Sequence, residues 1–157
     1  MQKLAANGIM CVLVEMPLNL AVLDVNAADG IQEKYPEIKE WYIGGHSLGG
    51  SMAASYIAEN LQEYSGLIML AAYSTEDLSD TGLKVLSIYG TEDNILNMEK
   101  YIDCLINLPR KTNEIIIPGG CHAYFGNYGE QEGDGIPEIS RRQQQDITVK
   151  EITDFIK

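Results

Sequence analysis

Residues 41–54 read WYIGGHSLGGSMAA, and this stretch decides the fold class. A short apolar run precedes the pattern Gly45-His46-Ser47-Leu48-Gly49, and small residues with helical character follow it. A G-x-S-x-G pattern between a strand and a helix predicts a sharp turn that lifts Ser47 above the edge of a sheet. Glycine is expected at positions 45 and 49 because the residues two before and two after the serine crowd each other in such a turn.

Short apolar runs and helical segments alternate along the rest of the chain. Continuous apolar strands separated by helices are typical of a parallel sheet covered on both faces. We therefore predict a single α/β domain over residues 1–157, with about five mostly parallel strands. The strands are expected over residues 9–14, 41–44, 66–72, 84–89 and 114–117. The helices are expected over residues 29–34, 48–60 and 97–106 and from Ser140 onward, with Asn26, Asn97 and Ser140 as N-caps.

The composition excludes several classes of function. A net charge of −12 repels phosphate backbones and anionic lipids, so we expect no nucleic-acid partner and no peripheral membrane role. No apolar run approaches the roughly 20 residues of a membrane-spanning helix. The 3 cysteines form no C-x-x-C pair, which argues against a zinc site or a disulfide framework and favours a reducing, cytoplasmic location. We expect no metal and no cofactor. The Gly- and acid-rich segment 126–138 is interpreted as a solvated loop, with a calcium site as the alternative.

A serine hydroxyl is a weak nucleophile until a base takes its proton, so Ser47 needs partners. The chain has only 2 histidines, and His122 follows the last predicted strand. Asp93 follows the strand over residues 84–89, where a carboxylate could orient the imidazole. The order Ser47, Asp93, His122 is that of the α/β-hydrolase triad. We therefore predict that these residues meet at the carboxyl edge of the sheet.

Alternatives exist for each partner. Asp77 and Asp80 follow the third predicted strand, and Glu92 is adjacent to Asp93, so each competes for the role of the acid. His46 is expected to be a packed or hydrogen-bonded residue beside the turn. Cys121 next to His122 suggests a cysteine nucleophile, but adjacent side chains seldom reach hydrogen-bond range of each other.

Two motifs carry a family resemblance. Residues 44–50 read GGHSLGG and residues 119–129 read GGCHAYFGNYG. Both are similar to motifs of the α/β-hydrolase superfamily, more narrowly of small bacterial dienelactone-hydrolase-like members of the alpha/beta hydrolase fold-5 type. The resemblance extends over essentially the whole chain. Cys121 and Tyr124 stand where the family pattern has Asn and Gln.

The resemblance also implies that the chain is the C-terminal portion of the family fold, shortened at its N-terminus. Relatives begin with additional strands and a loop bearing an H-G or P-G-G motif. One of those strands would lie between residues 9–14 and 41–44, so we expect either a direct pairing of these two segments or a gap. In this fold the backbone N–H of Leu48 supplies one donor of the oxyanion hole, and the upstream loop supplies the second.

Two classes of function follow. The first is a serine hydrolase that cleaves an ester or similar acyl bond in a small molecule through Ser47, His122 and Asp93. The second is a catalytically weak or inactive hydrolase fragment, or a binding module, that lacks the second oxyanion donor. Exposed sheet edges favour self-association in both cases. A targeting or anchor segment in the missing N-terminus would change the expected cytoplasmic location.

Overall fold

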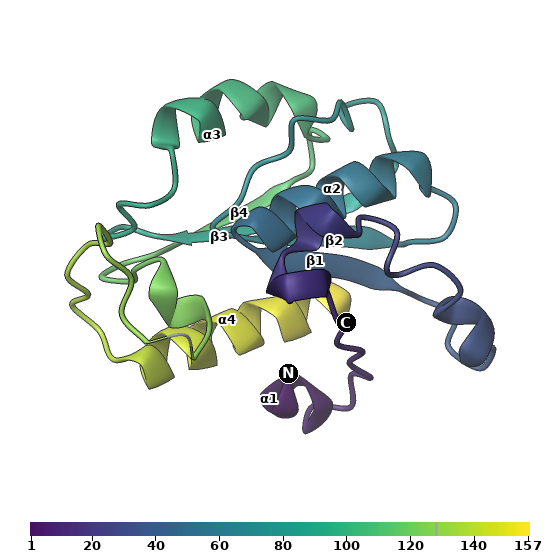
Figure 1. Cartoon of the computed structure of the whole chain (residues 1–157), viewed down its shortest axis with the longest axis horizontal. Helices are drawn as coiled ribbons and strands as arrows, with labels where there is room; N and C mark the ends of the chain where they lie inside the picture. The colour runs from purple at the N-terminus through teal and green to yellow at the C-terminus, as the bar shows by residue number, and fades with distance from the viewer. Residues whose placement is uncertain (128) are drawn as a thin grey trace.

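The computed structural model describes residues 1–127 and 129–157. Within them a single sheet has four strands in the order β1-β2-β3-β4 (Figure 1). All three strand pairings are parallel, so the carboxyl ends of the strands share one edge of the sheet. The strands are β1 (Tyr42–His46), β2 (Gly66–Leu70), β3 (Lys84–Gly90) and β4 (Asn113–Ile117). The α/β fold class predicted from the sequence is confirmed.

Helices cover both faces of this sheet (Figure 1). The α-helices are α1 (Gln2–Ala5), α2 (Leu48–Glu59), α3 (Met98–Cys104) and α4 (Arg141–Ile156). Helices α2 and α3 lie on one face, and α4 lies on the other with α1 beside it. Short 3-10 turns connect these elements: η1 (Pro17–Asn19), η2 (Ala21–Leu23), η3 (Gln32–Lys34), η4 (Leu105–Asn107) and η5 (Ala123–Phe125).

The alternation of side chains in the two central strands builds a core on each face. One core joins α2 to residues of one parity, which include Leu67, Met69 and Val85. The other core joins α4 to residues of the opposite parity, which include Ile68, Leu86 and Ile88. Strands apolar on both faces are what a sheet between two helical layers requires.

Two of the predicted N-caps are formed. The Asn97 side chain accepts a hydrogen bond from Lys100 N at 2.9 Å at the start of α3. Ser140 and Gln143 form a reciprocal capping box at the start of α4. The helix predicted over residues 97–106 ends earlier than expected as an α-helix and continues as η4.

Two predicted elements differ in the structure. Residues 9–14 form no strand, although their composition is that of a buried one. In the described part of the chain this segment pairs with no strand, and β1 is an edge strand of the sheet. The gap, rather than a direct pairing with β1, is therefore the outcome. The helix expected over residues 29–34 is reduced to turns and η3, because a segment this short gains too few hydrogen bonds to offset nucleation.

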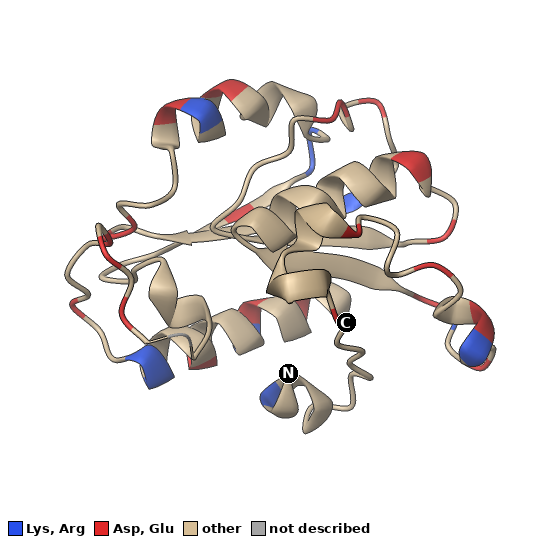
Figure 2. Ribbon diagram, in the orientation of Figure 1, with Lys and Arg blue, Asp and Glu red and all other residues tan. Residues whose placement is uncertain are grey.

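Acidic residues are spread over the helices and loops, and fewer basic residues lie among them (Figure 2). In the described residues, no helix has the length and apolar character needed to cross a membrane.

Candidate active site

Ser47 occupies the turn between β1 and α2. Its φ of 53° and ψ of −123° lie outside the regions that non-glycine residues usually adopt. Backbone bonds on both sides hold this conformation: Ser47 N donates to Leu70 O of β2 at 2.9 Å, and the Ser47 carbonyl accepts from Gly50 N and Ser51 N of α2. The N–H groups of Leu48 and Gly49, the first two residues of α2, have no acceptor within the helix. The site therefore places a hydroxyl next to the N-terminal amides of a helix.

The glycines of the turn have different roles. A Cβ at Gly45 would collide with the carbonyl group of Gly49, and one at Gly50 would lie 2.6 Å from the Ala72 side chain. A Cβ at Gly49, in contrast, would meet nothing within 4 Å. The expectation that Gly49 must lack a side chain is therefore wrong. The Gly49 backbone leaves no room for a side chain at Gly45, so Gly45 and Gly50 are the two positions where the turn requires glycine.

Asp93 and His122 form a buried pair. The His122 Nδ1 lies 3.0 and 2.9 Å from the two Asp93 carboxylate oxygens, and the two side chains are 2% and 0% exposed. The carboxylate also accepts hydrogen bonds from Ile95 N and Leu96 N. These bonds hold Asp93 in place and leave Nε2 as the ring nitrogen that can act on a substrate or a nucleophile.

Backbone contacts tie together the two loops that carry this pair. Glu92 N donates to Gly120 O at 2.8 Å, and Thr91 N donates to Ile117 O at 3.0 Å. A Cβ at Gly90 would collide with the Gly120 carbonyl, so the ends of β3 and β4 approach as closely as backbones can. The separation of Asp93 from His122 is therefore set by the sheet.

His46 connects the serine turn to this pair. Its ring centroid lies 4.5 Å from that of His122 and 5.6 Å from that of Phe125. Burial, and then the nearby His122 ring, lower the pKa of His46 to about 4. His46 is thus a neutral packed residue at neutral pH, as expected, and its contact brings the residue next to Ser47 against His122. Among the described residues, no hydrogen bond joins the Ser47 hydroxyl to His122.

The competing candidates lie elsewhere. Asp77 is exposed and accepts hydrogen bonds from Ser79, Asp80 is exposed, and the Glu92 carboxylate accepts from its neighbour Thr91. In the structure as described, His122 forms a side-chain hydrogen bond with Asp93 and with none of these three. Cys121 is buried, and burial followed by the nearby Asp134 raises its pKa to about 11, which keeps the thiol protonated. Within the described part of the chain, no group of three His, Cys, Asp or Glu side chains is arranged to hold a metal ion.

Residues 1–146 match the model of the alpha/beta hydrolase family. The chain belongs to this family. Among curated proteins, none matches this α/β hydrolase.

Several solved structures have the same fold. The chain resembles a thermophilic esterase from Thermogutta terrifontis, with a TM-score of 0.62, 11% identity and coverage of 93% of this chain and 74% of that one. It also resembles a monoacylglycerol lipase from Paleococcus ferrophilus, with a TM-score of 0.60, 13% identity and coverage of 86% of this chain and 76% of that one. A third similar structure is a predicted CIB-like hydrolase from Thermoplasma acidophilum, with a TM-score of 0.56, 16% identity and coverage of 83% of this chain and 60% of that one. This α/β hydrolase thus spans less than two thirds of the length of the Thermoplasma protein.

One residue of the site was missed by sequence reasoning. Asp134, in the Gly- and acid-rich segment, accepts hydrogen bonds from the backbone of His122 and Ala123. A carboxylate among several others in a loop gives no signal of such a contact. Tyr128, part of the second motif, lies outside the described residues.

Proposed function

We propose that this α/β hydrolase is a serine hydrolase that cleaves an ester or similar acyl bond in a small substrate. The observation that carries the proposal is the buried hydrogen-bonded pair of Asp93 and His122, at the same sheet edge as the strained turn of Ser47. A buried carboxylate against Nδ1 favours the tautomer that leaves Nε2 free to accept a proton. That is the arrangement a serine needs in order to attack a carbonyl carbon.

In the proposed reaction, Ser47 Oγ attacks the carbonyl carbon as His122 Nε2 takes the hydroxyl proton. Asp93 holds the ring and stabilises the imidazolium that forms. Collapse of the tetrahedral intermediate breaks the acyl bond, and His122 returns the proton to the leaving alcohol. Water, deprotonated by the same imidazole, then attacks the acyl-enzyme and releases the carboxylic acid and free Ser47. The Leu48 N–H donates a hydrogen bond to the oxyanion in both steps.

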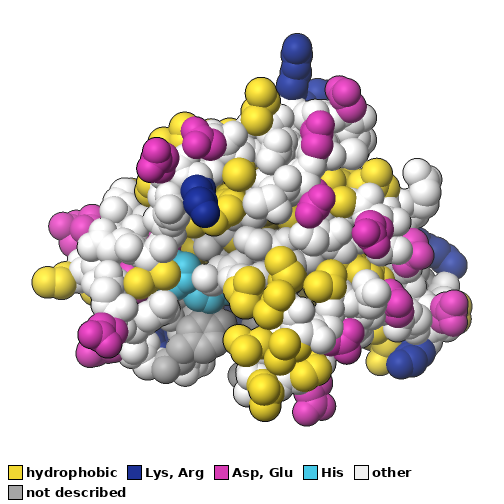
Figure 3. Space-filling model, turned by 45° about the horizontal axis from the view of Figure 1, so that its top comes forward, with side chains coloured by type: hydrophobic (Ala, Val, Ile, Leu, Met, Phe, Trp, Pro, Cys, Tyr) yellow, Lys and Arg dark blue, Asp and Glu magenta, His cyan; other side chains and the backbone are white. Residues whose placement is uncertain are grey.

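An apolar surface beside the site supports a substrate with an apolar portion. Figure 3 shows apolar side chains gathered next to the histidines. Leu48, directly after the serine, is 43% exposed. The similar structures include an esterase and a monoacylglycerol lipase, whose names are consistent with acyl substrates.

A fluorophosphonate probe tests the nucleophile directly. We expect labelling of the wild-type chain and none of Ser47→Ala, with Ser51→Ala as the matched control because Ser51 lies one helical turn further on and donates to Tyr73 O instead. Turnover of p-nitrophenyl acetate should follow the same pattern. Labelling that survives Ser47→Ala would overturn the assignment.

A second candidate function is a low-turnover chain that binds or acylates without efficient release. It is favoured by the lack of a hydrogen bond between Ser47 and His122 within the described residues. Pre-steady-state kinetics separate the two functions: a burst of one p-nitrophenol per chain followed by a very slow steady rate indicates the second. Sustained turnover indicates the first, because catalytic hydrogen bonds often tighten only when a substrate binds.

A further inference from the structure

The turn that carries His122 has an unusual capping problem. Helical turn η5 begins directly after His122, so the N–H groups of His122 and Ala123 have no acceptor within the turn. The residue directly before a helical turn often caps it with its own side chain, but the side chain of His122 is bound to Asp93 instead. Both residues are 2% exposed, which leaves little access for water. Buried donors of this kind cost about 1–3 kcal/mol each when they lack an acceptor.

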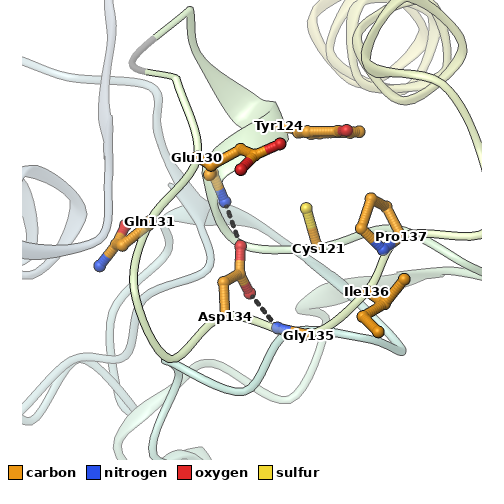
Figure 4. A pocket seen from close by; sticks show the side chains of 9 residues that line it. Cys121, Tyr124, Glu130, Gln131, Asp134, Gly135, Ile136 and Pro137 are labelled. Carbon is orange, nitrogen blue, oxygen red and sulfur yellow. Dashed lines mark hydrogen bonds between the residues drawn. The ribbon is translucent and has the colours of Figure 1, made fainter.

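Asp134 supplies the missing acceptors from 12 residues further along the chain. Its Oδ1 accepts from His122 N at 3.1 Å, and its Oδ2 accepts from Ala123 N at 2.8 Å. Gly135 N donates to Oδ1 at 2.9 Å and holds the carboxylate in this orientation. Figure 4 shows Asp134 at the pocket beside Cys121, with the hydrogen bonds from Ala123 N and Gly135 N to its two oxygens.

A second side chain holds the residue before His122. The Gln144 amide of α4 accepts from Cys121 N at 3.0 Å and donates to Cys121 O at 2.8 Å. Gln144 is fully buried, whereas Asp134 lies at the wall of an open pocket of about 260 Å³. Gln144, a core residue, therefore fixes the backbone of Cys121, and Asp134, a loop residue, fixes the N–H groups of His122 and Ala123.

The state of Asp134 fits this role. Burial alone would raise its pKa, but hydrogen bonds from Ala123 N, His122 N, Gly135 N and the Cys121 thiol outweigh burial and hold the pKa below its usual value. The side chain is consequently ionised at neutral pH, and an ionised carboxylate is the stronger acceptor for backbone N–H groups. The close packing of Gly135 against the Glu92 carbonyl adds a further link between this loop and the loop of Asp93.

We propose that Asp134 is a positioning residue for His122: by fixing the backbone of its turn, it keeps the imidazole bound to Asp93 and aimed at Ser47. The proposal rests on the serine hydrolase function proposed above. It gives the Gly- and acid-rich loop a role in catalysis rather than in calcium binding.

The test compares Asp134→Ala and Asp134→Asn with Glu132→Gln, which alters an exposed carboxylate of the same loop. The pH profile of p-nitrophenyl acetate hydrolysis and the NMR titration of the His122 ring are measured for each. A misplaced catalytic group costs up to roughly 100-fold in rate, so we expect a 10- to 100-fold loss of kcat in Asp134→Ala with a much smaller change in KM. Asp134→Asn, which keeps one carbonyl acceptor, should fall between Asp134→Ala and the wild type. Glu132→Gln should match the wild type.

Three outcomes would overturn the proposal. The first is a normal kcat and an unchanged His122 titration in Asp134→Ala. The second is a lower melting temperature without any change in kcat for the folded protein, because that is a purely structural role. The third is an equal loss in Glu132→Gln. If the wild-type chain fails to hydrolyse the ester or to label at Ser47, the proposed function fails, but the NMR titration still decides. A shifted His122 titration in Asp134→Ala supports positioning, and an unshifted one contradicts it.

Discussion

The His122 imidazole faces both oxygens of the Asp93 carboxylate, at 2.9 and 3.0 Å from Nδ1, beneath a surface that exposes almost none of either side chain. Asp93 is held there by two backbone N–H groups, those of Ile95 and Leu96, from its own turn. The carboxylate is therefore fixed by the protein itself. Replacing it should change the state of the imidazole more than the shape of the site.

Asp93→Asn is expected to lower kcat for p-nitrophenyl acetate by a factor on the order of 10⁴, because an amide favours the wrong imidazole tautomer. The matched control is Asp77→Asn, which removes an exposed carboxylate that accepts hydrogen bonds from Ser79. That variant should retain full activity. A silent Asp93→Asn together with an inactive Asp77→Asn would place the acid after β2 instead.

The protein should lose stability as the pH falls from about 6.5 to about 4, because His46 takes up a proton in the unfolded state before it does so in the folded state. Above pH 6.5 the residue is neutral in both states and has no effect. Below pH 4 it is charged in both, and the loss is complete, on the order of 3 kcal/mol. Urea unfolding at several pH values measures this loss in the free energy of unfolding.

His46→Gln removes this titration and is the control for it. Carboxylates that are hydrogen-bonded in the folded state, such as Asp134, also lose their contribution as the pH falls, but at lower pH than His46. The difference between wild type and His46→Gln therefore isolates the histidine. If the two proteins lost the same free energy of unfolding between pH 6.5 and 4, the ring would not be buried as the structure has it.

Gly45→Ala and Gly49→Ala should have opposite effects on stability although they lie in one motif. A Cβ at Gly45 collides with the Gly49 carbonyl, so this variant should lose about 1–3 kcal/mol, the usual cost of overpacking. A Cβ at Gly49 has open space in the first turn of α2, where alanine gains up to about 1 kcal/mol over glycine. Thermal unfolding of the pair checks the prediction. Comparable losses in both would mean that the crowding is mutual after all.

We propose that the chain self-associates on the side where β1 is the edge strand. The backbone of β1 on that side pairs with no described strand, and the neighbouring N-terminal segment exposes Leu13 and Leu18 by 79% and 83%. Unpaired edges and exposed apolar patches favour association. Leu13→Lys with Leu18→Lys should shift the mass measured by sedimentation equilibrium toward the monomer. Ile136→Lys, at a residue 86% exposed in the acid-rich loop, should leave the mass unchanged. A monomeric wild type would contradict the proposal.

Much of this fold could be predicted from the sequence, because its central elements carry their own signals. The strands β2 and β3 are continuous apolar runs, and α4 begins at the predicted N-cap Ser140. The pairing of Asp93 with His122 followed from the rule that the ends of parallel strands share an edge. Each of these inferences depends on local chemistry or on a property of the whole sheet.

The remaining features depend on contacts that no local pattern records. Residues 9–14 have the composition of a strand, but a strand forms only where a neighbour accepts its hydrogen bonds. The open space at Gly49 depends on the direction of a single Cα–Cβ bond in a strained turn. The contact of Asp134 with His122 joins two loops whose relative placement depends on how α4 packs.

The loops after β3 and β4 are tied to each other by bonds in which the turn after β1 takes no part: Glu92 N with Gly120 O, and Gly119 N with the Thr91 hydroxyl. Ser47, in contrast, is anchored to β2 through Leu70 O. The Asp93–His122 pair and Ser47 are thus held in place by separate sets of hydrogen bonds. Exchange of the residue at position 47, for example for cysteine, should therefore leave the imidazole and its carboxylate where they are.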